Sequence, residues 1–205
     1  MNFTSVFYLL PLLLLLNSCA GTYKELLPSK VAYPNDRGVE AIGFTYKYDL
    51  LSARGNKKYA KKEEKKGIRV VGVKIENKTN RTLVVGEDLQ LYRGNDPINL
   101  LETESIYRSL RQTPPIYLLY LLLFPAELTI TVNNDITTYP LGYVLGPGLA
   151  LGNMGQAAHA NGRMKKELQL ENLMGRAVDP GETVYGLVGV IGNNYDLLRL
   201  RLQTE

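Results

Sequence analysis

The chain has few of the residues that most often build catalytic and metal sites. Its 205 residues include one cysteine, one histidine and no tryptophan. The single cysteine excludes an intramolecular disulfide, and His159 has no second histidine nearby to complete a metal site. No serine lies in a G-x-S-x-G context, and the glycine-rich stretch 142–155 lacks the Gly-Lys-Ser/Thr of a phosphate-binding loop. We therefore expect no catalytic residues, no metal and no cofactor.

The chain begins with an apolar leader. Val6 to Leu16 is apolar throughout and interrupted only by Pro11, which matches a signal-peptide core and is too short to span a bilayer. Asn17 and Ser18 follow, and then the single cysteine, Cys19. The pattern predicts a signal peptide over residues 1–18, although no lysine or arginine precedes the apolar core.

Leu16-Asn17-Ser18-Cys19 resembles the lipobox of bacterial lipoproteins. The resemblance implies that the Cys19 sulfur receives a diacylglycerol, that cleavage occurs before Cys19, and that the new amine is acylated, with palmitate-type chains. Ala20 in place of Asp implies sorting to the outer membrane of a Gram-negative bacterium. The alternative is an ordinary secretory peptide or an uncleaved anchor, with Cys19 an incidental thiol.

The net charge of +4 is concentrated in one segment. Residues 52–67 hold Arg54, six lysines and two glutamates, a local +5, so the rest of the chain carries −1. We interpret this segment as a solvated loop between two paired strands, in preference to a site for anionic headgroups or an acidic partner. Export from the cytoplasm argues against a nucleic-acid partner.

Residues 19–38, with two prolines and little periodicity, predict a lipidated cysteine followed by a tether. Residues 39–205 predict a domain with about seven short strands. Alternating apolar residues place strands at 42–48, 69–76 and 198–202, and turn residues bound four further strands at 82–85, 88–92, 98–101 and 184–191. Arg199 and Arg201 alternate with leucines and are expected on the outer face of an edge strand. Short strands separated by turn residues favour an antiparallel β-sandwich.

Three segments resemble immunoglobulin-like domains of bacterial envelope lipoproteins. They are the strand before Asn77, the Leu89–Tyr92 strand (LQLY) and the corner Pro180-Gly181-Glu182-Thr183, with Gly186 three residues later. The resemblance covers roughly residues 39–101 and 176–203. It implies a mainly β, immunoglobulin-like fold and no functional residues.

Residues 102–174 interrupt this pattern and are expected to form a helical, glycine-rich insertion. Glu102–Arg111 predicts a short helix ending before Pro114, and residues 116–124 form an apolar run. Residues 128–132 and 136–139 suggest a hairpin around Asn133-Asn134-Asp135. Residues 153–170 suggest a helix.

The insertion has three interpretations. In the one we favour, Leu118, Leu119, Leu121 and Leu122 form a core within one chain, against the backbone of Gly142 to Gly152. In the second, the spaced glycines form an oligomer seam. In the third, the segment contacts the bilayer, although Pro140, Pro147 and Asn153 are costly in lipid.

Together these patterns predict a non-enzymatic envelope lipoprotein, anchored through acylated Cys19 and serving as a binding or structural module. The expected partners are the membrane, through the lipid, and an envelope protein that the sequence does not identify. The alternative is a subunit of a membrane-associated export or transport assembly that uses the glycine-rich insertion as a seam.

Overall fold

The structure is a computed structural model that describes residues 19–34 and 41–203. The predicted signal peptide, residues 1–18, and the lipobox residues before Cys19 lie outside the described residues. The chain divides into two compact units. We call residues 19–22 with 112–160 the insertion unit, and residues 23–111 with 161–203 the sheet unit. The division falls inside helix α5 (Gly142–Leu170).

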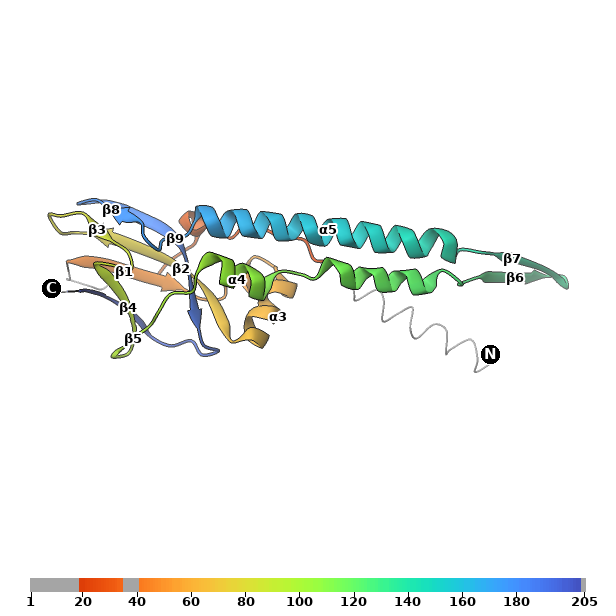
Figure 1. The fold of residues 1–205 in the computed structure, drawn as a ribbon, viewed down its shortest axis with the longest axis horizontal. Helices are drawn as coiled ribbons and strands as arrows, with labels where there is room; N and C mark the ends of the chain where they lie inside the picture. The colour runs from red at the N-terminus through yellow and green to blue at the C-terminus, as the bar shows by residue number, and fades with distance from the viewer. Residues whose placement is uncertain (1–18, 35–40, 204–205) are drawn as a thin grey trace. The chain divides into compact units, whose positions relative to one another are not determined.

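The central sheet of the sheet unit has the order β1-β2-β9 and is antiparallel throughout. Its strands are β1 (Ile42–Lys47), β2 (Ile68–Asn77) and β9 (Thr183–Ile191). Figure 1 shows the three strands side by side although β9 follows β2 by more than a hundred residues. All three strands were predicted from the sequence, and the prediction is confirmed.

A second antiparallel sheet has the order β10-β4-β5, and a short pair joins β3 to β8. The strands are β3 (Leu83–Val84), β4 (Leu89–Arg93), β5 (Asp96–Pro97), β8 (Ala177–Val178) and β10 (Leu198–Leu202). Their apolar side chains share one core with the central sheet. In β10 the leucines at 198 and 200 are buried while Arg199 and Arg201 are exposed, as predicted for an edge strand.

The strand expected at residues 98–101 is not formed. The short strand β5 lies just before it and pairs back onto β4 across Gly94 and Asn95. Leu101 makes only an isolated bridge to Gly189. Because the turn at Gly94 and Asn95 reverses the chain directly after β4, the paired strand begins at Asp96 and not at Ile98.

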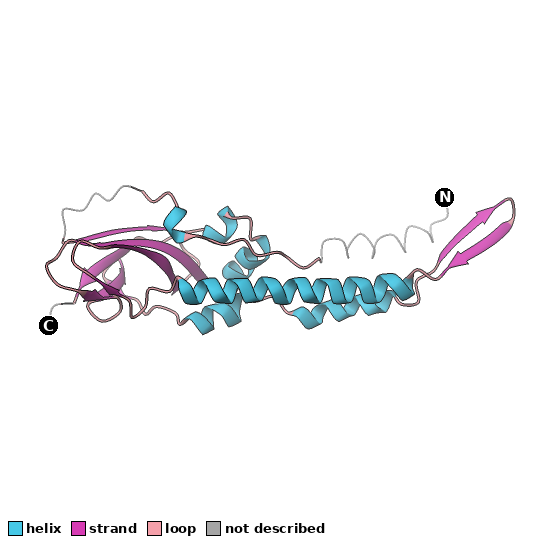
Figure 2. Ribbon diagram, turned by 90° about the horizontal axis from the view of Figure 1, so that it is seen from above, coloured by secondary structure: helices cyan, strands magenta, loops and turns pink. Residues whose placement is uncertain are grey.

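Short helices pack on the other face of the central sheet, where a Cβ on Gly72 of β2 would lie 2.7 Å from Leu50 Cδ1. Figure 2 shows the helices in cyan and the strands in magenta. The short helices are η1 (Pro28–Lys30), α2 (Leu50–Ala53), α3 (Lys57–Lys66) and α4 (Thr103–Leu110). Gly189 of β9 makes room for α4, since a Cβ there would lie 2.7 Å from Ile106 Cγ1. The described chain is therefore a mixed fold with antiparallel sheets at its core, richer in helix than the mainly β prediction.

The basic segment 52–67 is not the loop that was expected. Most of it forms α2 and α3, and α3 ends at Gly67 in the left-handed conformation. Tyr59 and Glu63 of α3 are buried while Lys57 and Lys61 are exposed. Lys57, Lys61, Lys65 and Lys66 are exposed on the outer face of a packed helix, whereas Lys58 and Lys62 are half-buried and Lys62 donates to the Arg111 carbonyl.

Part of the expected tether is packed against the sheet unit. Tyr23 and Leu26 are buried, and their partner is Glu167 of α5. The Glu167 carboxylate accepts hydrogen bonds from Tyr23 Oη at 2.5 Å and from the backbone N–H groups of Leu26 and Leu27 at 2.7 and 3.0 Å. Residues 23–27 are thereby fixed to the sheet unit, and the last part of the expected tether, 35–38, lies outside the described residues.

The insertion unit contains η2 (Pro114–Leu123), a β-hairpin and the first part of α5. The predicted hairpin is confirmed, with β6 (Leu128–Val132) paired to β7 (Asp135–Tyr139). Asn133 and Asn134 connect the strands with φ values of 49° and 70°. Two consecutive positive φ values are typical of a type I′ turn, which matches the twist of a two-residue hairpin.

The four leucines expected as core are all exposed. Leu118, Leu119, Leu121 and Leu122 have exposed fractions between 42% and 75%, whereas Tyr117 and Tyr120 are buried. Residues 114–123 form a 3₁₀ helix with about three residues per turn, so Tyr117 and Tyr120 fall on one face. The core of the run is therefore aromatic, and the leucines point outward.

Candidate functional site

Cys19, the predicted lipidation site, is exposed, and the residues that follow it are held in the insertion unit. The Ala20 N–H donates to Asn153 Oδ1 at 2.6 Å. Gly21 and Gln112 exchange two hydrogen bonds, from Gly21 N to Oε1 at 2.9 Å and from Nε2 to the Gly21 carbonyl at 2.7 Å. Gln112 is buried, so this link is shielded from water. The backbone that leaves Cys19 is thus fixed to α5 and to the loop that precedes η2.

A small core joins η2 to α5. Tyr117 and Tyr120 stack with ring centroids 6.4 Å apart and pack with Ala150 and Ala157 of α5. Ala20 packs at the edge of the same cluster. Gly142 permits close approach of the backbones, because a Cβ there would lie 2.7 Å from Ala126 N and closer still to two carbonyl oxygens of the η2 end. Part of the predicted packing of glycines within one chain is therefore present.

Beyond this core the insertion unit has little interior. In the described residues it holds 17 of the 22 exposed large hydrophobic side chains, located on η2, the hairpin and the first turns of α5. An isolated two-stranded hairpin is at best marginally stable in water, and every residue of both strands is exposed. Apolar surface of this extent marks an interaction site in most soluble proteins.

The later glycines of α5 differ from Gly142. A Cβ on Gly148, Gly152 or Gly155 would meet no atom within 4 Å. Their spacing of four and three residues places them on one helix face, and all three are exposed. That face is open for close approach of another surface.

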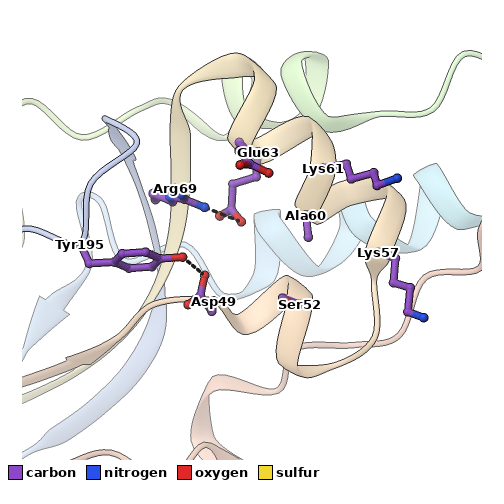
Figure 3. Close-up of a pocket in the computed structure, with 9 residues that line it drawn as sticks. Asp49, Ser52, Lys57, Ala60, Lys61, Glu63, Arg69 and Tyr195 are labelled. Carbon is purple, nitrogen blue, oxygen red and sulfur yellow. Dashed lines mark hydrogen bonds and ion pairs between the residues drawn. The ribbon is translucent and has the colours of Figure 1, made fainter.

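A separate cleft lies in the sheet unit, where α2 and α3 meet the start of β2 (Figure 3). It has a volume of about 350 Å³ and is bordered by acidic and basic side chains. Tyr195, from the loop before β10, donates from its hydroxyl to Asp49 Oδ1 at 2.9 Å. The Arg69 guanidinium lies 5.0 Å from the centre of the Tyr195 ring, and its Nη2 donates to the Asn193 carbonyl at 2.8 Å.

Glu63 is the buried acid of this cleft. Its Oε1 accepts the Val70 N–H at 2.6 Å, and its Oε2 lies 3.8 Å from Arg69 Nη1. Burial raises the pKa of the Glu63 carboxyl to about 7, against the opposing effects of the Val70 N–H and the Arg69 guanidinium. The hydrogen bond to Asp49 raises the pKa of the Tyr195 hydroxyl. Asp49 and Glu63 are therefore each bonded to a partner within the fold, and we interpret the cleft as a polar contact between α3 and β2.

Two further groups of ionisable residues are His159 and the acids at the start of α4. His159 is exposed on α5, and no group of three potential metal ligands occurs within residues 19–34 and 41–203. Glu104 forms ion pairs with Arg108 at 2.9 Å and Lys165 at 3.1 Å. Glu102 precedes α4 at its N-cap position without a side-chain capping bond. The two ion pairs of Glu104 are exposed and contribute little to stability.

Sequence reasoning missed Gln112, Asn153, Glu63 and Arg69. Each is a polar residue whose partner lies far away in the sequence or on another element, so no local pattern marks it. An uncharged polar residue in an otherwise apolar stretch, such as Asn153, was the one available signal.

Comparison with known proteins gives no relative. No protein-family model matches the chain, and neither a curated protein nor a solved structure matches it. In the part of the chain that the structure describes, no helix has both the length and the apolar character needed to cross a membrane.

Proposed function

We propose that the mature protein begins at an acylated Cys19 and serves as a non-enzymatic interaction module on the outer membrane of a Gram-negative bacterium. One observation carries this proposal: the backbone after Cys19 is hydrogen-bonded to Gln112 and Asn153, within the unit that exposes most of the apolar surface. A lipid on Cys19 would place this surface next to the membrane. Two or more acyl chains suffice for stable anchoring.

The finer fold is part of the same proposal. We infer that the sheet unit is an immunoglobulin-like sandwich in which the central sheet faces β10-β4-β5. The support is the shared core, to which Val71 and Val188 contribute from one sheet and Leu91 and Leu200 from the other. The helices on the outer face of the central sheet are then additions to the sandwich.

The anchor is tested by Cys19→Ala in the full chain. The variant should lose labelling by a palmitate analogue and either leave the membrane fraction or accumulate as an uncleaved precursor. Ser18→Ala is the matched control, because it keeps a small residue before the cysteine and should be labelled like the wild type. Equal labelling of Cys19→Ala and the wild type would refute acylation at this residue.

The second candidate function is a subunit of a membrane-associated export or transport assembly. The open face of Gly148, Gly152 and Gly155 favours it, because such spacing lets helices approach closely. Gly152→Leu would then dissolve an oligomer observed by light scattering, because its side chain would block close approach of a second surface. A wild type that is monomeric in detergent and in lipid would remove this candidate.

A further inference from the structure

The exposed apolar side chains of the insertion unit surround it and are not confined to one stripe. Val132 faces Asp135 across the hairpin and Ile136 faces Thr131, so Val132 and Ile136 lie on opposite faces. They are 60% and 71% exposed, which leaves both faces of the hairpin uncovered. A protein partner of ordinary size covers one face of such an element, whereas lipid can surround it.

The charge of the unit fits the same environment. Between Arg111 and Arg163 the only formally charged residues are Glu127 and Asp135. Glu127 directly precedes β6, Asp135 is the first residue of β7, and both are exposed. Tyr139 and Tyr143 are exposed near the same end of α5, and amphipathic rings favour the level of lipid headgroups.

The hydrogen bonding of the unit limits how deep it lies. The hairpin has two strands, so each has an outer edge whose backbone groups face away from its partner. Unpaired backbone groups are costly in hydrocarbon but are satisfied by water and headgroups in the interfacial layer. The absence of a spanning helix in the described residues agrees with this depth.

The position of Cys19 supplies the last step. Its neighbours Ala20 and Gly21 are hydrogen-bonded to Asn153 and Gln112. A lipid on Cys19 would therefore hold the membrane beside the exposed apolar surface of the insertion unit. We propose that η2, the β6-β7 hairpin and the first turns of α5 insert into the interfacial layer of a phospholipid bilayer. This inference deepens the proposed function, and its test removes the anchor so that the two are judged separately.

The test uses residues 19–205 with Cys19→Ala, which carry no acyl chain. The protein contains no tryptophan, so Leu122→Trp adds a single probe at a residue that is 75% exposed. With neutral phosphatidylcholine vesicles, the Trp emission should shift to shorter wavelength and be quenched by lipids brominated along the acyl chain. Binding should change little between low and high salt, since so few charges take part.

Two matched triple variants locate the binding surface. Leu122→Gln, Val132→Thr and Ile136→Thr together remove exposed apolar groups of the insertion unit, and should lower vesicle partitioning by about tenfold or more. Leu170→Gln, Ile191→Thr and Leu197→Gln remove three aliphatic side chains of similar exposure from the sheet unit. This control should partition like the parent protein.

Three outcomes would overturn the proposal. They are a parent protein that stays in the aqueous phase, equal losses in both triple variants, and a Trp probe already shielded in a lipid-free oligomer. The last result would assign the surface to a second copy of the chain. Acylation is read independently, by labelling of the full-length protein in cells, and a negative result there leaves the vesicle measurement valid.

Discussion

The Tyr23 hydroxyl donates a 2.5 Å hydrogen bond to the Glu167 carboxylate, although the two residues are 144 positions apart. The same carboxylate accepts the N–H groups of Leu26 and Leu27. One buried side chain of α5 therefore fixes the N-terminal segment that follows the proposed anchor. This bond makes the segment part of the sheet unit.

Glu167→Ala should destabilise the sheet unit by about 3 kcal/mol or more, because it leaves the buried Tyr23 hydroxyl and the buried Leu26 N–H without an acceptor. Glu167→Gln keeps one acceptor oxygen and should cost less. Urea unfolding measures both. Glu25→Gln is the control, since its pair with Arg163 is exposed and contributes little. Equal stability of Glu167→Ala and Glu25→Gln would contradict the role given to Glu167.

The buried Glu63 predicts a pH dependence of stability. Its pKa is about 7 in the fold and near 4.5 when the chain is unfolded, so between these values the folded state binds more protons. Stability should therefore fall as pH rises from 4.5 to 7, by on the order of 3 kcal/mol at most. Glu63→Gln should remove most of this slope and keep an acceptor for Val70.

The measurement for Glu63 is urea unfolding at pH 5 and pH 8. Glu64→Gln serves as the control, because Glu64 is the exposed neighbour on the same helix and should keep the wild-type slope. A Glu63→Gln variant with the full wild-type slope would show that another group is responsible.

The strands were predictable because their signal is local. In β1, β10 and the second half of β2 the apolar residues alternate, whereas β9 is a short apolar run between turn residues and is buried on both faces. The hairpin was predictable for a similar reason, since Asn133-Asn134 suits a two-residue turn. The arginines of β10 were correctly placed on the outer face by the same alternation.

The elements that were missed depend on distant contacts. The segment 57–66 reads as a charged loop until Glu63 is seen to accept the Val70 N–H and Tyr59 is seen to pack against Tyr23 at 5.3 Å. The run 116–124 is apolar on every side, so its composition does not reveal which residues face α5. The 3₁₀ period decides in favour of Tyr117 and Tyr120, and that period is not visible in the sequence.

Tyr120 and Leu121 should respond very differently to truncation. Tyr120→Ala removes a buried ring from the small core and should cost about 3 kcal/mol in the insertion unit. Leu121 is 42% exposed, so Leu121→Ala should cost less than about 1 kcal/mol in water. Hydrogen exchange of the amides in η2 and α5 measures the local stability. Similar protection in the two variants would contradict the assignment of the tyrosines to the core.

Gly142 and Gly152 lie in the same helix, α5, but replacing each with alanine should change local stability in opposite directions. A Cβ at Gly142 would collide with the backbone around Ala126, so Gly142→Ala should force η2 and α5 apart and speed exchange of the η2 amides. A Cβ at Gly152 meets open space, and replacing a helix glycine by alanine stabilises the helix by about 1 kcal/mol. Gly152→Ala should therefore slow exchange in α5. If both variants speed it, the face around Gly152 is covered by another surface in solution, and the open face assigned to α5 would be wrong.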